Sequence, residues 1–112
     1  MTQISQARTL SDKALLVLAA KAAGIKLIPY ENAPLIDDEG ETYWNPLTDD
    51  GDALRLAVKL ELIVEYRRRT NACFVYHYAT ELEVVERTQN YDTCAATRRA
   101  IVRAAALVGA QM

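Results

Sequence analysis

Apolar residues recur at helical spacing in three segments of this chain. The first is Ser11–Ala23, where Ser11 is suited to cap the first turn of a helix and Gly24 to end it. In the central segment, Thr48–Lys59, the local signals agree best, because Pro46 keeps the residue before it out of the helical region and Thr48 is a favourable cap. The apolar face expected for this helix consists of Ala53, Leu54, Ala57 and Val58.

The third helical segment is Ala95–Val108. Asp92 or Thr93 is suited to cap it, and Gly109 is expected to stop it. Its apolar face is mostly alanine, and such small side chains let a helix lie close to a sheet.

Alternation of apolar and polar residues predicts three strands between the last two helices. Leu60–Tyr66 alternates with a period of two, so we expect a strand with one buried face. Ala72–Ala79 is rich in aromatic and β-branched residues, and Leu82–Arg87 predicts a third strand. The residues expected on the buried face of the first strand are Leu60, Leu62, Val64 and Tyr66.

Two further short strands, Ile25–Tyr30 and Thr42–Trp44, are expected on either side of an acidic loop, Glu31–Glu41. The elements together predict an α+β fold, a mainly antiparallel sheet covered by about three helices in the order α-β-β-α-β-β-β-α. The 112 residues match a single domain, 1–112, in which we expect residues 1–10 to be flexible.

The charge and cysteine content narrow the classes of function. A formal charge of −2 gives no overall attraction to nucleic acid or to an anionic membrane. The polar start of the chain leads us to expect no signal peptide, and its apolar runs fall short of the roughly 20 residues that a membrane span needs. We therefore expect a protein of the reducing cytoplasm with two free thiols, Cys73 and Cys94.

Candidate catalytic and metal-binding residues are few. The acidic run Asp49–Asp52 fails the spacing test for a calcium-binding EF-hand, and its carboxylates fit the positive end of a helix dipole better. His77 is the only histidine and is expected opposite the buried face of its strand, without a partner that would make it a general base. Cys94, at a helix start, is the more reactive candidate thiol. We expect no metal, no cofactor and no enzymatic activity.

Two arginine clusters are candidate anion sites. Arg67, Arg68 and Arg69 occupy an expected hairpin turn, whereas Arg98, Arg99 and Arg103 lie on the last helix. A solvated helix face is the simpler explanation of the second cluster. The alternative is a phosphate or nucleotide site, since guanidinium groups bind phosphate in a bidentate manner.

An acidic, aromatic stretch is the candidate protein-binding surface. Tyr43 and Trp44 are either core residues or anchors of an interface, where tyrosine and tryptophan are enriched, and the sequence leaves both open. The carboxylates expected beside them are those of Glu39, Glu41, Asp49, Asp50 and Asp52.

Three segments resemble a family of small phage and prophage proteins, the phage ABA sandwich domain family. They are Ala19–Leu27 (AAKAAGIKL), Tyr43–Leu60 (YWNPLTDDGDALRLAVKL) and Ala95–Gly109 (AATRRAIVRAAALVG). The resemblance implies an α/β sandwich and an accessory phage protein acting in the bacterial cytoplasm. It implies no catalytic residues.

The leading hypothesis is therefore a phage-encoded, non-enzymatic binding protein that inhibits or redirects a host component. Its target would be a protein complex of host defence or a signalling nucleotide. A double-stranded-RNA-binding-like module is the first alternative, because Thr48–Gly109 is ordered helix, three strands, helix. The acidic start of its first helix would repel RNA, which disfavours this alternative. A small virion or assembly component that forms homo-oligomers is the second alternative.

Overall fold

The computed structural model describes residues 10–28, 35–36 and 42–112, and these form an α+β fold. Its elements are α2 (Asp12–Ala23), β1 (Leu27–Ile28), β2 (Leu35–Ile36), β3 (Thr42–Tyr43), α3 (Asp50–Lys59), β4 (Leu62–Arg67), β5 (Ala72–His77), β6 (Leu82–Arg87) and α4 (Thr93–Ala110). The predicted class is confirmed, and β2 is an additional short strand within the segment expected to be a loop.

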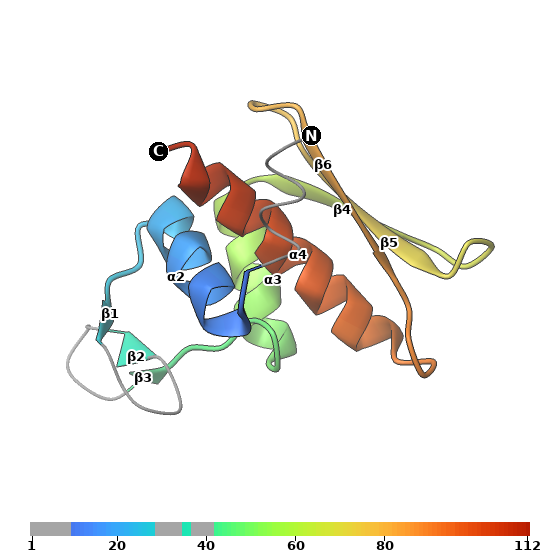
Figure 1. Ribbon diagram of the computed structural model, residues 1–112, viewed down its shortest axis with the longest axis horizontal. Helices are drawn as coiled ribbons and strands as arrows, with labels where there is room; N and C mark the ends of the chain where they lie inside the picture. The colour runs from blue at the N-terminus through green and yellow to red at the C-terminus, as the bar shows by residue number, and fades with distance from the viewer. Residues whose placement is uncertain (1–9, 29–34, 37–41) are drawn as a thin grey trace.

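The main sheet is antiparallel in the order β4-β5-β6, with the central strand supplied by the run of aromatic and β-branched residues. Four-residue turns join the strands, since Arg67 pairs with Ala72 and His77 pairs with Leu82. The two-residue strands β1, β2 and β3 form a second, small antiparallel sheet. Figure 1 shows the helices on one side of the main sheet and the small sheet beyond α2, away from the main sheet.

Helix α4 is the centre of the molecule. It packs against β5 and β6 on one side and α2 on another, and α3 runs beside it (Figure 1). Every residue from Ala100 to Gly109 is buried, as expected of a helix that other elements surround. The prediction that Gly109 stops the helix is wrong, because α4 continues to Ala110 and Gly109 instead lies against the backbone of α2.

The start of α3 differs by one residue from its prediction. Asp49, not Thr48, is the cap, and its carboxylate accepts a hydrogen bond of 2.8 Å from the N–H of Asp52. The carboxylate of Asp52 in turn accepts the N–H of Asn45 at 2.9 Å, which joins the helix to the chain before it. Asp52 is buried, whereas the sequence analysis placed it on the candidate protein-binding surface.

The strand β4 is less buried than its alternating pattern predicts. Leu62 and Tyr66 pack against the core, but Val64, between them on the same face, is 38 % exposed. The firmly buried residues of the sheet lie on its central strand and on β6: Ala72, Cys73, Val75 and Val84. Tyr78, which follows β5, is exposed and does not belong to the core.

Candidate functional site

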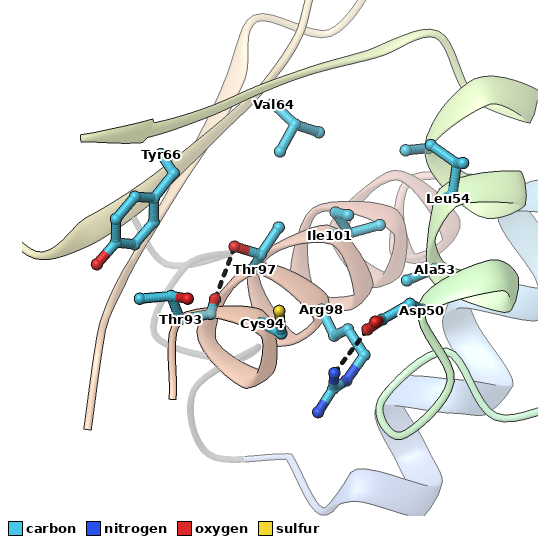
Figure 2. Close-up of a pocket in the computed structure, with 11 residues that line it drawn as sticks. Asp50, Ala53, Leu54, Val64, Tyr66, Thr93, Cys94, Thr97, Arg98 and Ile101 are labelled. Atoms are coloured by element: carbon cyan, nitrogen blue, oxygen red, sulfur yellow. Dashed lines mark hydrogen bonds and ion pairs between the residues drawn. The ribbon is translucent and has the colours of Figure 1, made fainter. Parts of the chain in front are cut away.

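An open groove of about 430 Å³ lies between α3, β4 and the first half of α4. Leu54 lies at one rim and Val64 at the opposite one, and Ile101 lies between them on the floor (Figure 2). Leu54 is 64 % exposed, whereas Ile101 is buried. The remaining lining residues are Asp50, Ala53, Ala57, Tyr66, Thr93, Cys94, Thr97 and Arg98.

The groove exists because α3 carries more apolar residues than its neighbours cover. Helix α3 buries Ala53, Leu56 and Ala57, while Leu54 and Val58, four residues apart on one face, stay exposed. The sequence placed Leu54 and Val58 on the buried face, and this prediction is wrong. The sequence did contain an indication that some of these residues are exposed. Apolar residues at positions 53, 54, 56, 57 and 58 are too many for a single face of a ten-residue helix.

One end of the groove is polar. Arg98 donates a hydrogen bond of 2.6 Å from Nη1 to the carboxylate of Asp50 and one of 2.8 Å from Nε to the carbonyl oxygen of Leu47. The dashed line between Arg98 and Asp50 in Figure 2 marks this ion pair. Cys94 is exposed in the first turn of α4, while Cys73 is buried, and both are free thiols.

His77, the single histidine of the sequence, does not line this groove. His77 lies at the end of β5, where Nδ1 is 2.6 Å from Oγ1 of Thr80. By the register of the sheet it is on the helix-facing side with Leu62 and Leu82, not on the opposite side as predicted. In the part of the chain that the structure describes, no three histidine, cysteine or acidic side chains are placed to hold a metal ion.

The arginines of α4 are each paired with a carboxylate from another element. Arg98 pairs with Asp50, Arg99 pairs with Asp12 at 2.8 Å, and Arg103 pairs with Glu86. Arg103 is buried, so it is not part of a solvent-facing cluster. A phosphate would have to compete with these carboxylates, which weakens the predicted anion site on α4.

A second, polar pocket of about 420 Å³ lies between β6 and the start of α4. Its lining includes two basic residues, Arg87 and Arg99, and two acidic ones, Glu86 and Asp92, so its charges largely cancel. The carboxylate of Asp92 already caps α4 by accepting the N–H of Ala95 at 2.9 Å. This pocket therefore favours no single class of charged ligand.

The predicted acidic, aromatic surface is only partly present. Trp44 is 3 % exposed and packs in the core, so it is not an interface anchor in this structure, whereas Tyr43 is 64 % exposed. Asp49 and Asp50 are exposed at the start of α3, close to the groove. Glu39 and Glu41 lie outside the described residues.

The other predicted arginine cluster lies where β4 turns into β5. Arg67 ends β4 and pairs with Glu65 at 2.9 Å, and Arg68 and Arg69 are exposed in the following turn. The structure does not bring this cluster into either pocket.

Comparison of the chain with protein-family models, with curated proteins and with solved structures finds no match. Within the described residues, none of the helices combines the length and the apolar composition that crossing a membrane requires.

Proposed function

We propose that this chain is a phage-encoded, non-enzymatic accessory protein that binds a host protein in the bacterial cytoplasm and thereby inhibits or redirects it. The resemblance of three of its segments to small phage proteins supports the phage origin. The observation that carries the binding proposal is the open groove between α3, β4 and α4, whose rim residues Leu54 and Val64 remain exposed.

An exposed groove of this kind favours a partner that inserts apolar side chains. Burial of a leucine or valine side chain contributes about 1.5–3 kcal/mol of favourable free energy. In the isolated chain the exposed side chains at the rim of the groove do not gain it. Scattered apolar residues on a surface need no explanation, but the exposed Leu54 and Val64 line the same hollow.

The charges beside the groove favour a partner segment with basic residues next to its apolar ones. Three carboxylates, those of Asp49, Asp50 and Asp52, gather at the start of α3. The two guanidinium groups that pair with them belong to Arg55 and Arg98, so the start of α3, beside the groove, keeps one negative charge in excess. Complementary charges speed association and select among partners more than they add affinity.

Pairs of variants test this proposal. Leu54→Glu and Val64→Glu each place a carboxylate at the rim, and both positions are exposed enough for the chain to fold. The tagged wild-type chain and these variants are incubated at nanomolar concentration with lysate of a bacterial host, and retained proteins are quantified by mass spectrometry. Val17→Glu, at an exposed position of α2 that does not line the groove, is the matched control.

We expect at least one host protein that the wild type and Val17→Glu retain and that both rim variants lose. Loss of that host protein with the Val17→Glu control as well would contradict binding through the groove. Native mass spectrometry of the same preparations tests the second version of the proposal, a sequestered signalling nucleotide. A nucleotide that co-purifies and is lost in the double variant Arg98→Ala/Arg99→Ala would favour that version over a protein partner.

A further inference from the structure

The face of the main sheet that points away from the helices carries aromatic and basic side chains. The strand register places Phe74 opposite Glu65 and Val85, and Tyr76 opposite Ile63 and Glu83. Two residues before Phe74, Ala72 pairs with Arg67 on one side and Arg87 on the other. Because side chains alternate along a strand, all of these residues share one face, here called the outer sheet face.

No described element covers the outer sheet face. In Figure 1, α3 and α4 lie on the other side of β4, β5 and β6. Of the partly buried sheet residues, Leu62, Tyr66 and Leu82 pack against the core, and all three belong to the helix-facing side. Phe74 and Tyr76 are thus two aromatic rings in the middle of an uncovered sheet, partly open to solvent.

Positive charge gathers at one end of this face. Arg67 and Arg87 lie on the two strands that flank Ala72, roughly 10 Å apart if each strand spacing is about 4.8 Å. Arg68 and Arg69 follow directly in the turn between β4 and β5, and both are exposed. The two carboxylates on the face are Glu65, already paired with Arg67, and Glu83, beside Tyr76 near the opposite end.

The aromatic and basic parts of the face are in contact. The guanidinium carbon of Arg67 lies 3.9 Å from the centre of the Phe74 ring, a stacked cation–π arrangement. The side chain of Arg67 is still 51 % exposed. Tyr76 makes an edge-to-face contact with the exposed ring of Tyr78, with 5.7 Å between the ring centres, which extends the aromatic surface.

We propose that the outer sheet face binds single-stranded nucleic acid. Bases stack on Tyr76 and on the paired Arg67 and Phe74, since aromatic rings and guanidinium planes both accept unpaired bases. Phosphates of the backbone meet Arg68, Arg69 and Arg87. This surface is separate from the groove of the proposed function, and neither proposal depends on the other.

Single strands fit this face better than duplexes or free nucleotides do. Phe74 and Tyr76 are two residues apart on one strand, about 7 Å, which leaves room for two bases side by side. Bases in a duplex are already stacked on one another and present only their edges. A free mononucleotide would occupy one stacking position and leave the other empty.

Few phosphate contacts imply weak and salt-dependent binding. Three arginines in contact with phosphates predict a slope of about −2 in a plot of log K against log salt concentration, from about −0.7 per contact with a single strand. With two stacked bases in addition, we expect a dissociation constant in the micromolar range at low salt.

Fluorescence anisotropy with a labelled 12-nucleotide oligo-dT or oligo-U tests the proposal, with the full chain as titrant. Tyr76→Leu keeps an apolar side chain and removes the ring, so we expect the affinity to fall about tenfold. Arg68→Gln and Arg69→Gln, in an exposed turn, leave the fold intact. We expect each to make the salt slope shallower by about 0.7. The matched controls are Tyr43→Leu and Arg55→Gln, an exposed tyrosine and an exposed arginine that lie elsewhere.

The outcomes separate this proposal from its competitors. Absence of binding at low salt, or an equal loss with Tyr43→Leu and Tyr76→Leu, overturns it. Equal affinity for a duplex of the same length, unaffected by Tyr76→Leu, would indicate a purely electrostatic contact and also overturns it. Leu54→Glu, at the groove, is expected to bind the oligonucleotide like the wild type, so failure of one proposal is distinguishable from failure of the other.

Discussion

The backbone of Gly109 in α4 lies directly against the backbone of Leu18 in α2. A Cβ atom placed on Gly109 would be 2.0 Å from the carbonyl oxygen of Leu18 and 2.9 Å from its carbonyl carbon. Both of these atoms belong to a helix backbone, so they cannot turn aside as the end of a side chain can. The absence of a side chain at Gly109 therefore sets how closely the two helices pack.

Gly109→Ala is expected to lower the free energy of unfolding by about 2 kcal/mol, because overpacking outweighs the gain of about 1 kcal/mol in helix propensity. Urea denaturation measures the change. Gly51→Ala in α3 is the matched control, since the three atoms nearest to a Cβ there belong to the Arg55 and Asp49 side chains, at 3.2 Å, and not to a backbone. We expect this control to be neutral or slightly stabilising. Similar destabilisation by both substitutions would contradict the role of the close helix contact.

Glu61, the second residue after α3, has a left-handed backbone conformation with φ of 55°. This conformation costs a residue with a Cβ atom roughly 1–2 kcal/mol, and it lets the N–H of Glu61 reach the carbonyl oxygen of Val58 at 3.1 Å. We expect Glu61→Gly to raise the free energy of unfolding by about 0.5–1 kcal/mol, measured by thermal unfolding. Glu61→Ala keeps the Cβ atom and should give no such gain. An equal rise with alanine would show that relief of backbone strain is not the cause.

Local sequence rules predict the elements of this fold well and their ends less well. The strand Leu82–Arg87 has the predicted bounds. Its β-branched residues favour a strand and the polar residues that flank it favour a turn, and both preferences are local. Thr48 and Asp49 are both favourable caps by the same rules. Asp49 is the cap because its carboxylate accepts the N–H of Asp52. The carboxylate of Asp52 in turn accepts the N–H of Asn45. From the sequence alone Gly109 resembles a helix stop. Its actual role, the close contact with the backbone of α2, depends on tertiary structure.

The groove was not predictable because a hydrophobic pattern does not say whether another element covers the apolar face. Leu54 and Val64 follow the spacing of buried residues, yet no described element packs over them. Trp44 shows the opposite case, since an aromatic residue beside an acidic loop suits an interface but is buried here. The outer sheet face likewise depends on the register that aligns Arg67 with Arg87 across Ala72, two strands apart.

Arg103 and Glu86 form an ion pair whose two partners differ in burial. Arg103 is 4 % exposed, and its Nη1 donates to the carbonyl oxygen of Val85 and to the carboxylate of Glu86. Its Nε and Nη2 are buried without a hydrogen-bond partner. The guanidinium therefore depends on Glu86 for its compensating charge.

We expect Glu86→Met to lower the free energy of unfolding by about 3 kcal/mol, because it leaves a buried charge uncompensated. We expect Arg103→Met to lower the free energy of unfolding by less, since the carboxylate of Glu86 is closer to solvent and can be hydrated. The double variant Glu86→Met/Arg103→Met is expected to be close to the wild type, because apolar side chains of similar size replace the pair. Chemical denaturation of the four proteins closes the double-mutant cycle. A double variant as unstable as the sum of the two single ones would rule out this coupling.

Burial raises the pKa of the Cys73 thiol above its ordinary value of 9.0; the Glu86 carboxylate also raises it, and a hydrogen bond with Thr97 lowers it in part. In the unfolded chain the thiol loses its proton above about pH 9, while in the folded chain it stays protonated. The unfolded state then binds fewer protons, so this contribution to stability is complete below about pH 9 and is lost as the pH rises towards the raised pKa.

We expect the stability advantage of the wild type over Cys73→Ala to be constant from about pH 6 to 8 and to shrink by up to about 1.4 kcal/mol per pH unit above pH 9. Urea denaturation across this range measures it, and Cys94→Ala, at the exposed thiol, should follow the wild type throughout. An advantage over Cys73→Ala that stays constant to about pH 10.5 would contradict the raised pKa.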